Sequence, residues 1–148
     1  NFEEYERGSI VHALRASTTM CRGFGDAYPN ACIAFVSAWR REEKGKMVAD
    51  TDYNRGIEDL KDRFVILTDP ALASGASLIA TIDKISKYIE PKNTIICCLH
   101  AAEEGIKNIE NEYPDIKIFS VFGPSDVNEH CYIVNGPGDC GDRSFNTK

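Results

Sequence analysis

Two short apolar runs, separated by one amphipathic segment, constrain the fold of this chain more than any other feature. The first run covers residues 64–68 (FVILT), and the second covers residues 94–99 (TIICCL). Continuous apolar runs of this length are typical of strands that are buried on both faces of a sheet. Between them, up to Pro91, apolar residues recur at helical spacing at Leu78, Ile79, Ile82, Ile85 and Ile89. The segment 64–99 therefore predicts a strand–loop–helix–strand unit, in which a right-handed crossover joins two parallel strands.

The same alternation continues in weaker form along the rest of the chain. Residues 103–113 carry apolar side chains on one helical face, and residues 116–121 follow as a strand with apolar alternation. Residues 31–37 (ACIAFVS) are a further strand candidate, and residues 132–134 are expected to form a last short strand before a rigid loop, GPGDCGDR. Strands that alternate with helices predict an α/β fold with a mainly parallel central sheet flanked by helices.

The most polar part of the chain, residues 40–62, interrupts this pattern. It contains the run RREEKGK and ends in DYNRGIEDLKDR. A long charged insertion of this kind is either an exposed arm or flap, or a solvated loop without fixed structure. We expect a single domain over residues 1–148, with the segment 40–62 as its polar arm or flap.

Charge and hydropathy exclude several classes of protein. The chain has 148 residues, with 17 basic and 23 acidic side chains and a formal net charge of −6. This acidic balance argues against a general binder of nucleic acid or anionic membranes, which would need a basic patch. The longest apolar run, residues 31–36, is far shorter than the roughly 20 residues of a membrane-spanning helix. No secretion signal is visible, and because the chain begins with Asn1 rather than Met, we expect the native N-terminus to lie upstream.

The six cysteines lack the spacing of a metal site or a disulfide framework. No Cys-x-x-Cys pair is present, and no two histidines have ligand spacing. Cys97 and Cys98 would point to opposite faces of one strand. We expect reduced, mostly buried thiols in a cytoplasmic protein. The remaining cysteines are Cys21, Cys32, Cys131 and Cys140.

A loop of small residues follows the first buried strand. The strand ends at Asp69, and the sequence ALASGAS leads from there into the predicted helix. Small side chains let backbone N–H groups converge on an anion, the helix dipole favours negative charge, and the hydroxyls of Ser74 and Ser77 can donate to phosphate oxygens. The Gly-Lys-Ser/Thr ending of a Walker loop is absent. From spacing alone the loop is either a phosphate-binding loop or a plain turn capped by Ser74 or Ser77.

Five segments together resemble the uracil phosphoribosyltransferase family. They are IVHALRASTTM, SAWRREE, VILTDPALASGAS, HAAEEGIKNIENEYPDIKIFS and NEHCYIVNGPGDCGDRSFNTK, and their order and spacing match the family over nearly the whole chain. The tail YIVxGxGDxGDRxF is the specific part, whereas the phosphate loop alone indicates only a phosphoribosyltransferase. The resemblance implies a type I phosphoribosyltransferase fold and a pyrimidine-salvage enzyme that converts uracil and 5-phosphoribosyl 1-pyrophosphate into uridine monophosphate and pyrophosphate. It also implies Mg²⁺, bound mainly through the donor, and a homodimer or larger homo-oligomer.

The resemblance also assigns roles to individual residues. Asp69 would face the ribose hydroxyls of the donor, and Arg15 and Arg40 would bind its pyrophosphate. Asp139 would touch both the donor and uracil. Because all three would act on the donor, Asp69, Arg15 and Asp139 are the expected catalytic residues. The rest of the loop around the 5-phosphate comprises Pro70, Ala71, Leu72, Ala73, Ser74, Gly75, Ala76 and Ser77. Uracil would be bound, mainly by main-chain groups, at Ile133, Gly138, Asp139 and Cys140.

The implied chemistry needs no side-chain nucleophile and no metal ligand from the protein. Pyrophosphate leaves with several negative charges, which the two arginines and Mg²⁺ would stabilise. A pocket that pairs every polar group on the edge of uracil rejects cytosine, because mismatched buried groups stay unpaired. The histidines are each expected at a strand end or in a loop, without a catalytic role; they are His12, His100 and His130.

The chain departs from the family pattern near the expected site. Ser17 stands in place of a usual glycine, Thr18 and Thr19 replace small or apolar residues, Ala76 replaces glycine, and Asn135 replaces proline. The family's N-terminal segment, which supplies helices and part of the subunit contact, is also missing. These departures leave open a non-catalytic protein of phosphoribosyltransferase fold that binds uracil, a nucleotide or a partner subunit. A third hypothesis is one piece of a larger polypeptide, such as a fusion to a nucleoside kinase domain.

Overall fold

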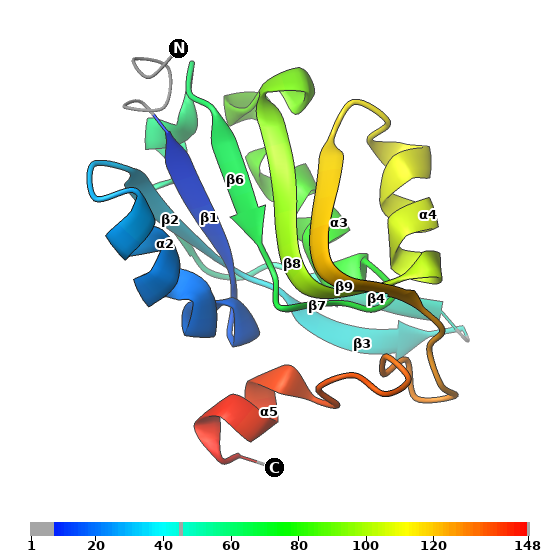
Figure 1. Cartoon of the computed structure of the whole chain (residues 1–148). Coiled ribbons are helices and arrows are strands. Elements are labelled where there is room, and N and C mark those ends of the chain that lie inside the picture. Colours follow the sequence, from blue (N-terminus) through cyan, green and yellow to red (C-terminus); the bar gives the residue numbers. More distant parts are fainter. Residues whose placement is uncertain (1–7, 45, 148) are drawn as a thin grey trace.

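A seven-stranded sheet forms the centre of the molecule (Figure 1). The computed structural model describes residues 8–44 and 46–147, and only the backbone of Arg40, Lys46 and Met47. The spatial order is β5-β2-β1-β6-β8-β9, and β7 continues the line of β6 along the same edge of β8. Among these described strands only β5 runs antiparallel to its neighbour. The strands are β1 (Ser9–Leu14), β2 (Cys32–Ser37), β5 (Asn54–Arg55), β6 (Val65–Thr68), β7 (Ala71–Leu72), β8 (Thr94–Ala102) and β9 (Lys117–Ser125).

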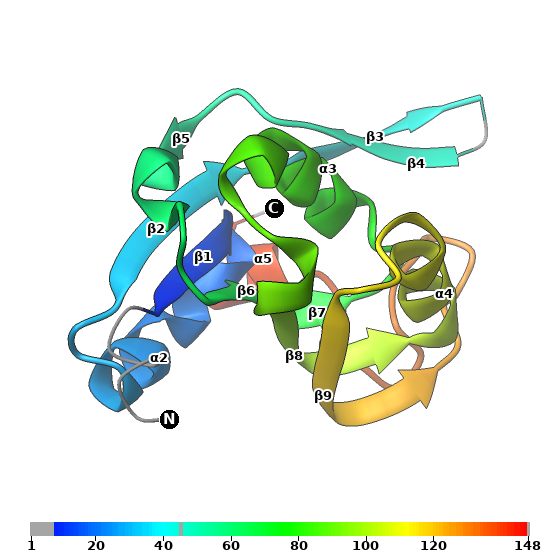
Figure 2. The same ribbon diagram turned by 90° about the horizontal axis from the view of Figure 1, so that it is seen from above.

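Helices lie on both faces of this sheet. Helices α3 and α4 cover one face and α2 lies on the other (Figure 2). The predicted α/β fold with a mainly parallel sheet flanked by helices is therefore confirmed. No helix in the described ranges is long and apolar enough to cross a membrane. The α-helices are α2 (Cys21–Ala27), α3 (Ala76–Ile85), α4 (Glu103–Glu112) and α5 (Cys140–Phe145), and the 3₁₀ turns are η1 (Ala16–Met20), η2 (Ile57–Leu60), η3 (Ser86–Tyr88) and η4 (Pro91–Asn93).

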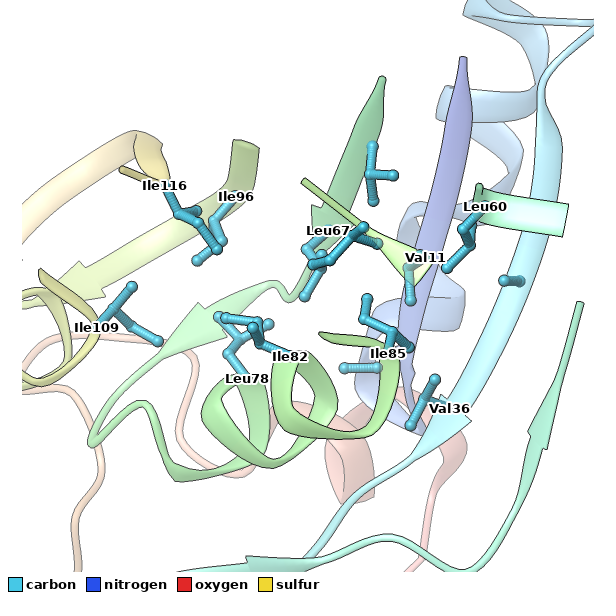
Figure 3. Close-up of a cluster of buried hydrophobic side chains, with 14 of the residues drawn as sticks. Val11, Val36, Leu60, Leu67, Leu78, Ile82, Ile85, Ile96, Ile109 and Ile116 are labelled. Atoms are coloured by element: carbon cyan, nitrogen blue, oxygen red, sulfur yellow. The ribbon is translucent and has the colours of Figure 1, made fainter. Parts of the chain in front are cut away.

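The main core lies between the sheet and α3 (Figure 3). Every residue of β6 is buried, as its continuous apolar run predicts. On α3 the residues at helical spacing, Leu78, Ile82 and Ile85, are at most 1% exposed and pack in the same cluster as Leu67 and Ile96. The strand–loop–helix–strand prediction is confirmed, because β6 and β8 pair in parallel.

The polar segment forms a shorter arm than the sequence predicts. Strands β3 (Trp39–Glu43) and β4 (Lys46–Asp50) make an antiparallel hairpin that lies apart from the main sheet (Figures 1 and 2). The chain then returns to the body, where β5 pairs with β2. In η2, Ile57 and Leu60 are 4% and 0% exposed, so their spacing of three residues buries one face of this turn. The prediction of an arm over 40–62 is therefore wrong for its second half.

Three local predictions are also wrong. His12 is expected at a strand end or in a loop but lies inside the central strand β1. The sequence pattern does not predict β1, because His12 interrupts its apolar run. The strand expected at residues 132–134 is reduced to one isolated bridge between Val127 and Ile133. The expected rigid loop ends in α5, because the carboxylate of Asp139 caps the first turn of that helix.

Candidate functional site

A cleft opens where the carboxyl ends of the parallel strands meet. Strands β1 and β6 are neighbours in the sheet and end at Leu14 and Thr68, so Arg15 and Asp69 emerge at the same edge. In open α/β sheets ligands bind outside this edge. The cleft has a volume of about 640 Å³. Trp39 of β3 and the first residues of α5 line the cleft. Figure 1 shows both elements below the same strand ends.

Most of the residues predicted from the sequence line this cleft. Pro70 does not, because its carbonyl oxygen accepts the N–H groups of Leu99 and His100 at 3.3 and 3.0 Å and so faces β8. Arg40 pairs with Ala49 within the hairpin, and its side chain is outside the described residues. Of the predicted residues, those that line the cleft are Arg15, Asp69, Ala71, Leu72, Ala73, Ser74, Gly75, Ala76, Ser77, Ile133, Gly138, Asp139 and Cys140.

The loop after β6 is shaped by its own backbone. The carboxylate of Asp69 accepts the N–H of Ala71 at 3.1 Å, and the N–H of Ala73 donates to Ala71 O at 3.1 Å. Gly75, at φ +82°, is the N-cap of α3 and makes no side-chain cap itself, but the N–H of Ala76 donates to Ser74 Oγ over a long distance of 3.5 Å. The loop therefore combines a weak closure by Ser74 with an open helix start. The first N–H groups of α3 have no partner within the helix, and Ala76 and its neighbours border the cleft, as anion binding requires.

Helix α4 supports this loop from behind, a contact that the sequence pattern does not predict. A Cβ atom on Gly105 would lie 2.3 Å from Ala73 O and 2.9 Å from Leu72 Cδ1, so only glycine allows this approach. The Asn108 side chain donates from Nδ2 to Ser74 O at 2.9 Å. Gly105 and Asn108 therefore set the position of the loop after β6.

Arg15 is held at the cleft by the C-terminal helix. Its guanidinium forms an ion pair with Asp142 and donates to Thr147 Oγ1 at 3.1 Å. Its Cζ atom lies 5.8 Å from the centroid of the Phe145 ring. The side chains of Arg15 and Asp142 are 54% and 32% exposed, and exposed pairs of this kind add little to stability. The pair therefore serves mainly to orient a half-exposed cation toward the cleft.

The segment expected to bind uracil is a series of tight turns. Ile133 is 6% exposed and packs with Ala73 of the loop after β6. Gly138 has a φ of +67° and Asn135 a φ of +57°. Proline has a fixed negative φ and cannot adopt the positive φ of residue 135, whereas asparagine tolerates it. The departure at Asn135 therefore matches the turn. The carboxylate of Asp139 accepts the N–H of Asp142 at 2.8 Å, so it fixes the start of α5 beside the cleft.

The cleft is also lined by residues to which the sequence analysis assigns no role in it, several of them at the base of the hairpin. Trp39 and Tyr53 are 49% and 50% exposed, at the two ends of the segment that forms the hairpin. The hydroxyl of Ser37 accepts the N–H of Tyr53 at 3.0 Å and donates to Asp52, which closes the base of the hairpin. In the sequence, only the position of Trp39 directly before Arg40 could have indicated that this part of the hairpin lines the cleft. His130 and Tyr132 line the cleft as well.

The cysteine side chains are free thiols. All six are unpaired in the structure, but only Cys98 is buried and the others are half-buried, so the expected burial is wrong for most of them. Burial raises the pKa of Cys98 to about 11 and also raises the pKa of Cys140 at the cleft. Both thiols are therefore protonated at neutral pH, a state in which sulfur is a poor nucleophile.

A buried polar cluster lies behind Arg15 and Asp69. It consists of His12 on β1, Ser17 on η1 and Thr68 on β6, each 0% exposed. The Nδ1 atom of His12 is 3.0 Å from Ser17 Oγ and 2.6 Å from Thr68 Oγ1. Burial lowers the pKa of His12 from 6.5 to about 4, so the imidazole is neutral at neutral pH.

We expect this histidine to make folding sensitive to acid. Because the folded-state pKa of His12 lies below the unfolded value, its contribution is complete above about pH 6.5 and is lost as the pH falls toward about 4. The free energy of unfolding should fall by about 2 kcal/mol between about pH 7.5 and pH 5 from this residue alone. Urea unfolding at both pH values, compared with the non-titrating variant His12→Gln, isolates the effect. An equal acid loss in both proteins would contradict it.

Comparisons with known proteins show the family of this chain. A family model described as uracil phosphoribosyltransferase matches residues 2–147. The uracil phosphoribosyltransferase of Burkholderia ambifaria (strain MC40-6) is 37% identical over 141 residues, which cover 95% of this chain and 63% of that protein. That of Burkholderia multivorans (strain ATCC 17616 / 249) is 36% identical with the same coverage. The chain thus spans less than two thirds of the length of these relatives.

Solved structures share the fold. The AQ2163 protein from Aquifex aeolicus has a TM-score of 0.85 and 33% sequence identity, over 94% of this chain and 65% of that one. A purine phosphoribosyltransferase from Pyrococcus horikoshii has a TM-score of 0.57 at 17% identity, over 86% of this chain and 85% of that one, which shows likeness of fold only. With the family match over almost its whole length, the chain belongs to the uracil phosphoribosyltransferase family.

Proposed function

We propose that this chain carries the active site of a uracil phosphoribosyltransferase, which transfers phosphoribose from 5-phosphoribosyl 1-pyrophosphate to uracil. One observation carries the proposal. The small-residue loop after β6 and the tight turns around Gly138 border a single cleft at the carboxyl ends of the strands. The loop that would bind the phosphate and the turns that would hold a flat ring therefore face one cleft, in which the donor and uracil would meet.

The donor would lie along the loop between β6 and α3. Its 5-phosphate would accept hydrogen bonds from the N–H groups at the start of α3 and from the hydroxyls of Ser74 and Ser77. Asp69 would accept from the ribose hydroxyls and favour the positive charge that develops on the ribose ring. Arg15, and Arg40 from the hairpin, would stabilise the departing pyrophosphate.

Uracil would lie against the turns that follow Ile133. This segment has few hydrogen-bonding side chains, so the main-chain groups of Ile133 and of residues 138–140 are the donors and acceptors that would pair with the ring edge. The positive φ of Gly138 lets the backbone approach a flat ring. Asp139 lines the cleft together with Gly138 and Asp69, and in this proposal it would contact both substrates.

Magnesium would enter with the donor. The described residues contain no group of three or more histidine, cysteine or acidic side chains that could hold a metal. Asp69 and Asp139 nevertheless both line the cleft. Mg²⁺ is commonly bound by one or two carboxylates together with substrate phosphates and water, so these residues fit it. When bound, the ion would neutralise charge on the leaving pyrophosphate.

The setting of the reaction belongs to the same proposal. The enzyme would act in pyrimidine salvage in the cytoplasm and would assemble as a homodimer or larger homo-oligomer. The hairpin β3–β4 lies apart from the main sheet and could contact a neighbouring subunit (Figure 2).

The direct test is the formation of uridine monophosphate from uracil, donor and Mg²⁺, with this chain and with a longer native form. We expect Gly138→Val to abolish product formation, because a β-branched residue is strongly strained at its φ of +67°. Gly23→Ala is the matched control, since a Cβ atom there has nothing within 4 Å. Binding of both substrates by the longer form without product would instead support the non-catalytic hypothesis.

A further inference from the structure

The turn that carries Arg15 is tied to the strand that ends before Asp69 by three buried polar side chains. Ser17, His12 and Thr68 are completely buried, and none of them lines the cleft. The Nδ1 atom of His12 lies within hydrogen-bond distance of both hydroxyls, at 3.0 Å for Ser17 and 2.6 Å for Thr68. The two hydroxyls also bond to each other. Each member of this triangle comes from a different element, so the triangle joins η1 to two strands.

The protonation state of the triangle follows from its partners. Nε2 of His12 is buried and has no hydrogen-bond partner among the described residues. A proton on Nδ1 leaves only a lone pair unpaired at Nε2, whereas the other tautomer would bury an unpaired donor. Nδ1–H then donates to Thr68 Oγ1, and the Thr68 hydroxyl is in reach of Val11 O at 3.3 Å. The cluster is thus neutral and nearly fully paired.

Short connections link this triangle to the two residues that would hold the donor. His12 and Thr68 are direct neighbours in the register of β1 and β6, and Asp69 directly follows Thr68, the last residue of β6. On the other side, the backbone N–H and the hydroxyl of Thr18 donate to Arg15 O at 3.0 and 2.7 Å. Loss of one hydroxyl from the triangle would therefore loosen the turn of Arg15 relative to Asp69.

We propose that Ser17, His12 and Thr68 are positioning residues that set the place of Arg15 relative to Asp69. The proposal rests on the proposed function, in which Arg15 contacts the pyrophosphate and Asp69 the ribose of one donor molecule. Ser17 stands where the family resemblance predicts glycine, and glycine has no hydroxyl to make this bond. The departure at Ser17 is then a structural feature of this chain that is compatible with donor binding.

The test separates positioning from stability. Ser17→Ala and Thr68→Val remove one hydroxyl each, and we expect each to raise the KM for the donor about tenfold, with the KM for uracil changed less than about twofold. Thr68→Ser keeps the hydroxyl and should restore the donor KM. Thr94→Val is the matched control, because Thr94 is 1% exposed and donates to Glu90 O at 2.9 Å, at the opposite end of the sheet.

Binding of inorganic pyrophosphate with Mg²⁺, measured by calorimetry, gives a second measurement that needs no turnover. If the wild-type protein binds pyrophosphate but makes no uridine monophosphate, the proposed function fails while weaker binding by the variants still supports the cluster. Equal changes in both KM values would overturn the inference. So would variants that match Thr94→Val in pyrophosphate binding, or a wild-type protein that does not bind pyrophosphate. If Thr68→Val does not fold, Ser17→Ala, which adds no volume, decides the question.

Discussion

Replacing Gly105 with alanine is expected to destabilise the protein and to displace the loop that would bind the 5-phosphate. The new Cβ atom would lie 2.3 Å from Ala73 O, so either α4 or the loop must move. Overpacking of this kind costs about 1–3 kcal/mol or more, and the better helix propensity of alanine offsets at most about 1 kcal/mol. Because α4 also bonds Ser74 O through Asn108, a shift of the helix moves the loop at two points.

The effect on catalysis should exceed the effect on stability. A displacement of about 1 Å in a group that positions substrate costs about a hundredfold in rate, so kcat/KM for the donor should fall by about that factor. Urea unfolding and steady-state kinetics measure the two effects. Gly25→Ala is the matched control on an exposed helix, because nothing lies within 4 Å of its added Cβ atom. If Gly105→Ala and Gly25→Ala behave alike, α4 does not support the loop.

Replacing Arg15 with glutamine is expected to lower kcat/KM for the donor by about a hundred- to a thousandfold, the usual cost of removing one preorganised group that stabilises transition-state charge. Glutamine keeps much of the length of the side chain but carries no charge. The ion pair with Asp142 is partly exposed, so stability should change by less than about 1 kcal/mol. A large kinetic loss without unfolding is thus the expected pattern.

Arg22→Gln is the control for charge alone. Arg22 lies on α2, its side chain is 93% exposed, and its Nε atom is 3.8 Å from Asp26 Oδ2. Steady-state kinetics on both variants, with donor and uracil varied separately, should show a loss only for Arg15→Gln. A similar small change in both variants would mean that Arg15 does not contact the pyrophosphate.

Local patterns in the sequence determined those elements whose apolar residues follow a regular spacing over a few neighbouring positions. The apolar run of β6 and the helical spacing of Leu78, Ile82 and Ile85 predict a buried strand and the helix that covers it, and both are observed. The small-residue loop between them predicts the position of an anion site, because neighbouring residues along the chain supply its N–H groups. The tail after Ile133 could be assigned to the same site only through its family resemblance.

Contacts between distant segments were decided by the tertiary structure. His12 interrupts the apolar run of β1, so the sequence pattern does not predict this strand. The residue is nevertheless buried, with Ser17 and Thr68 as partners of its Nδ1 atom. From the sequence alone, Gly105 is a residue of low helix propensity within a helix. The structure shows that glycine is required there, because Ala73 packs against it. The partner of Arg15 lies 127 positions away along the chain. A sequence shows which side chains are polar, small or charged, but their partners are selected by packing over long separations, and only the folded chain brings them together.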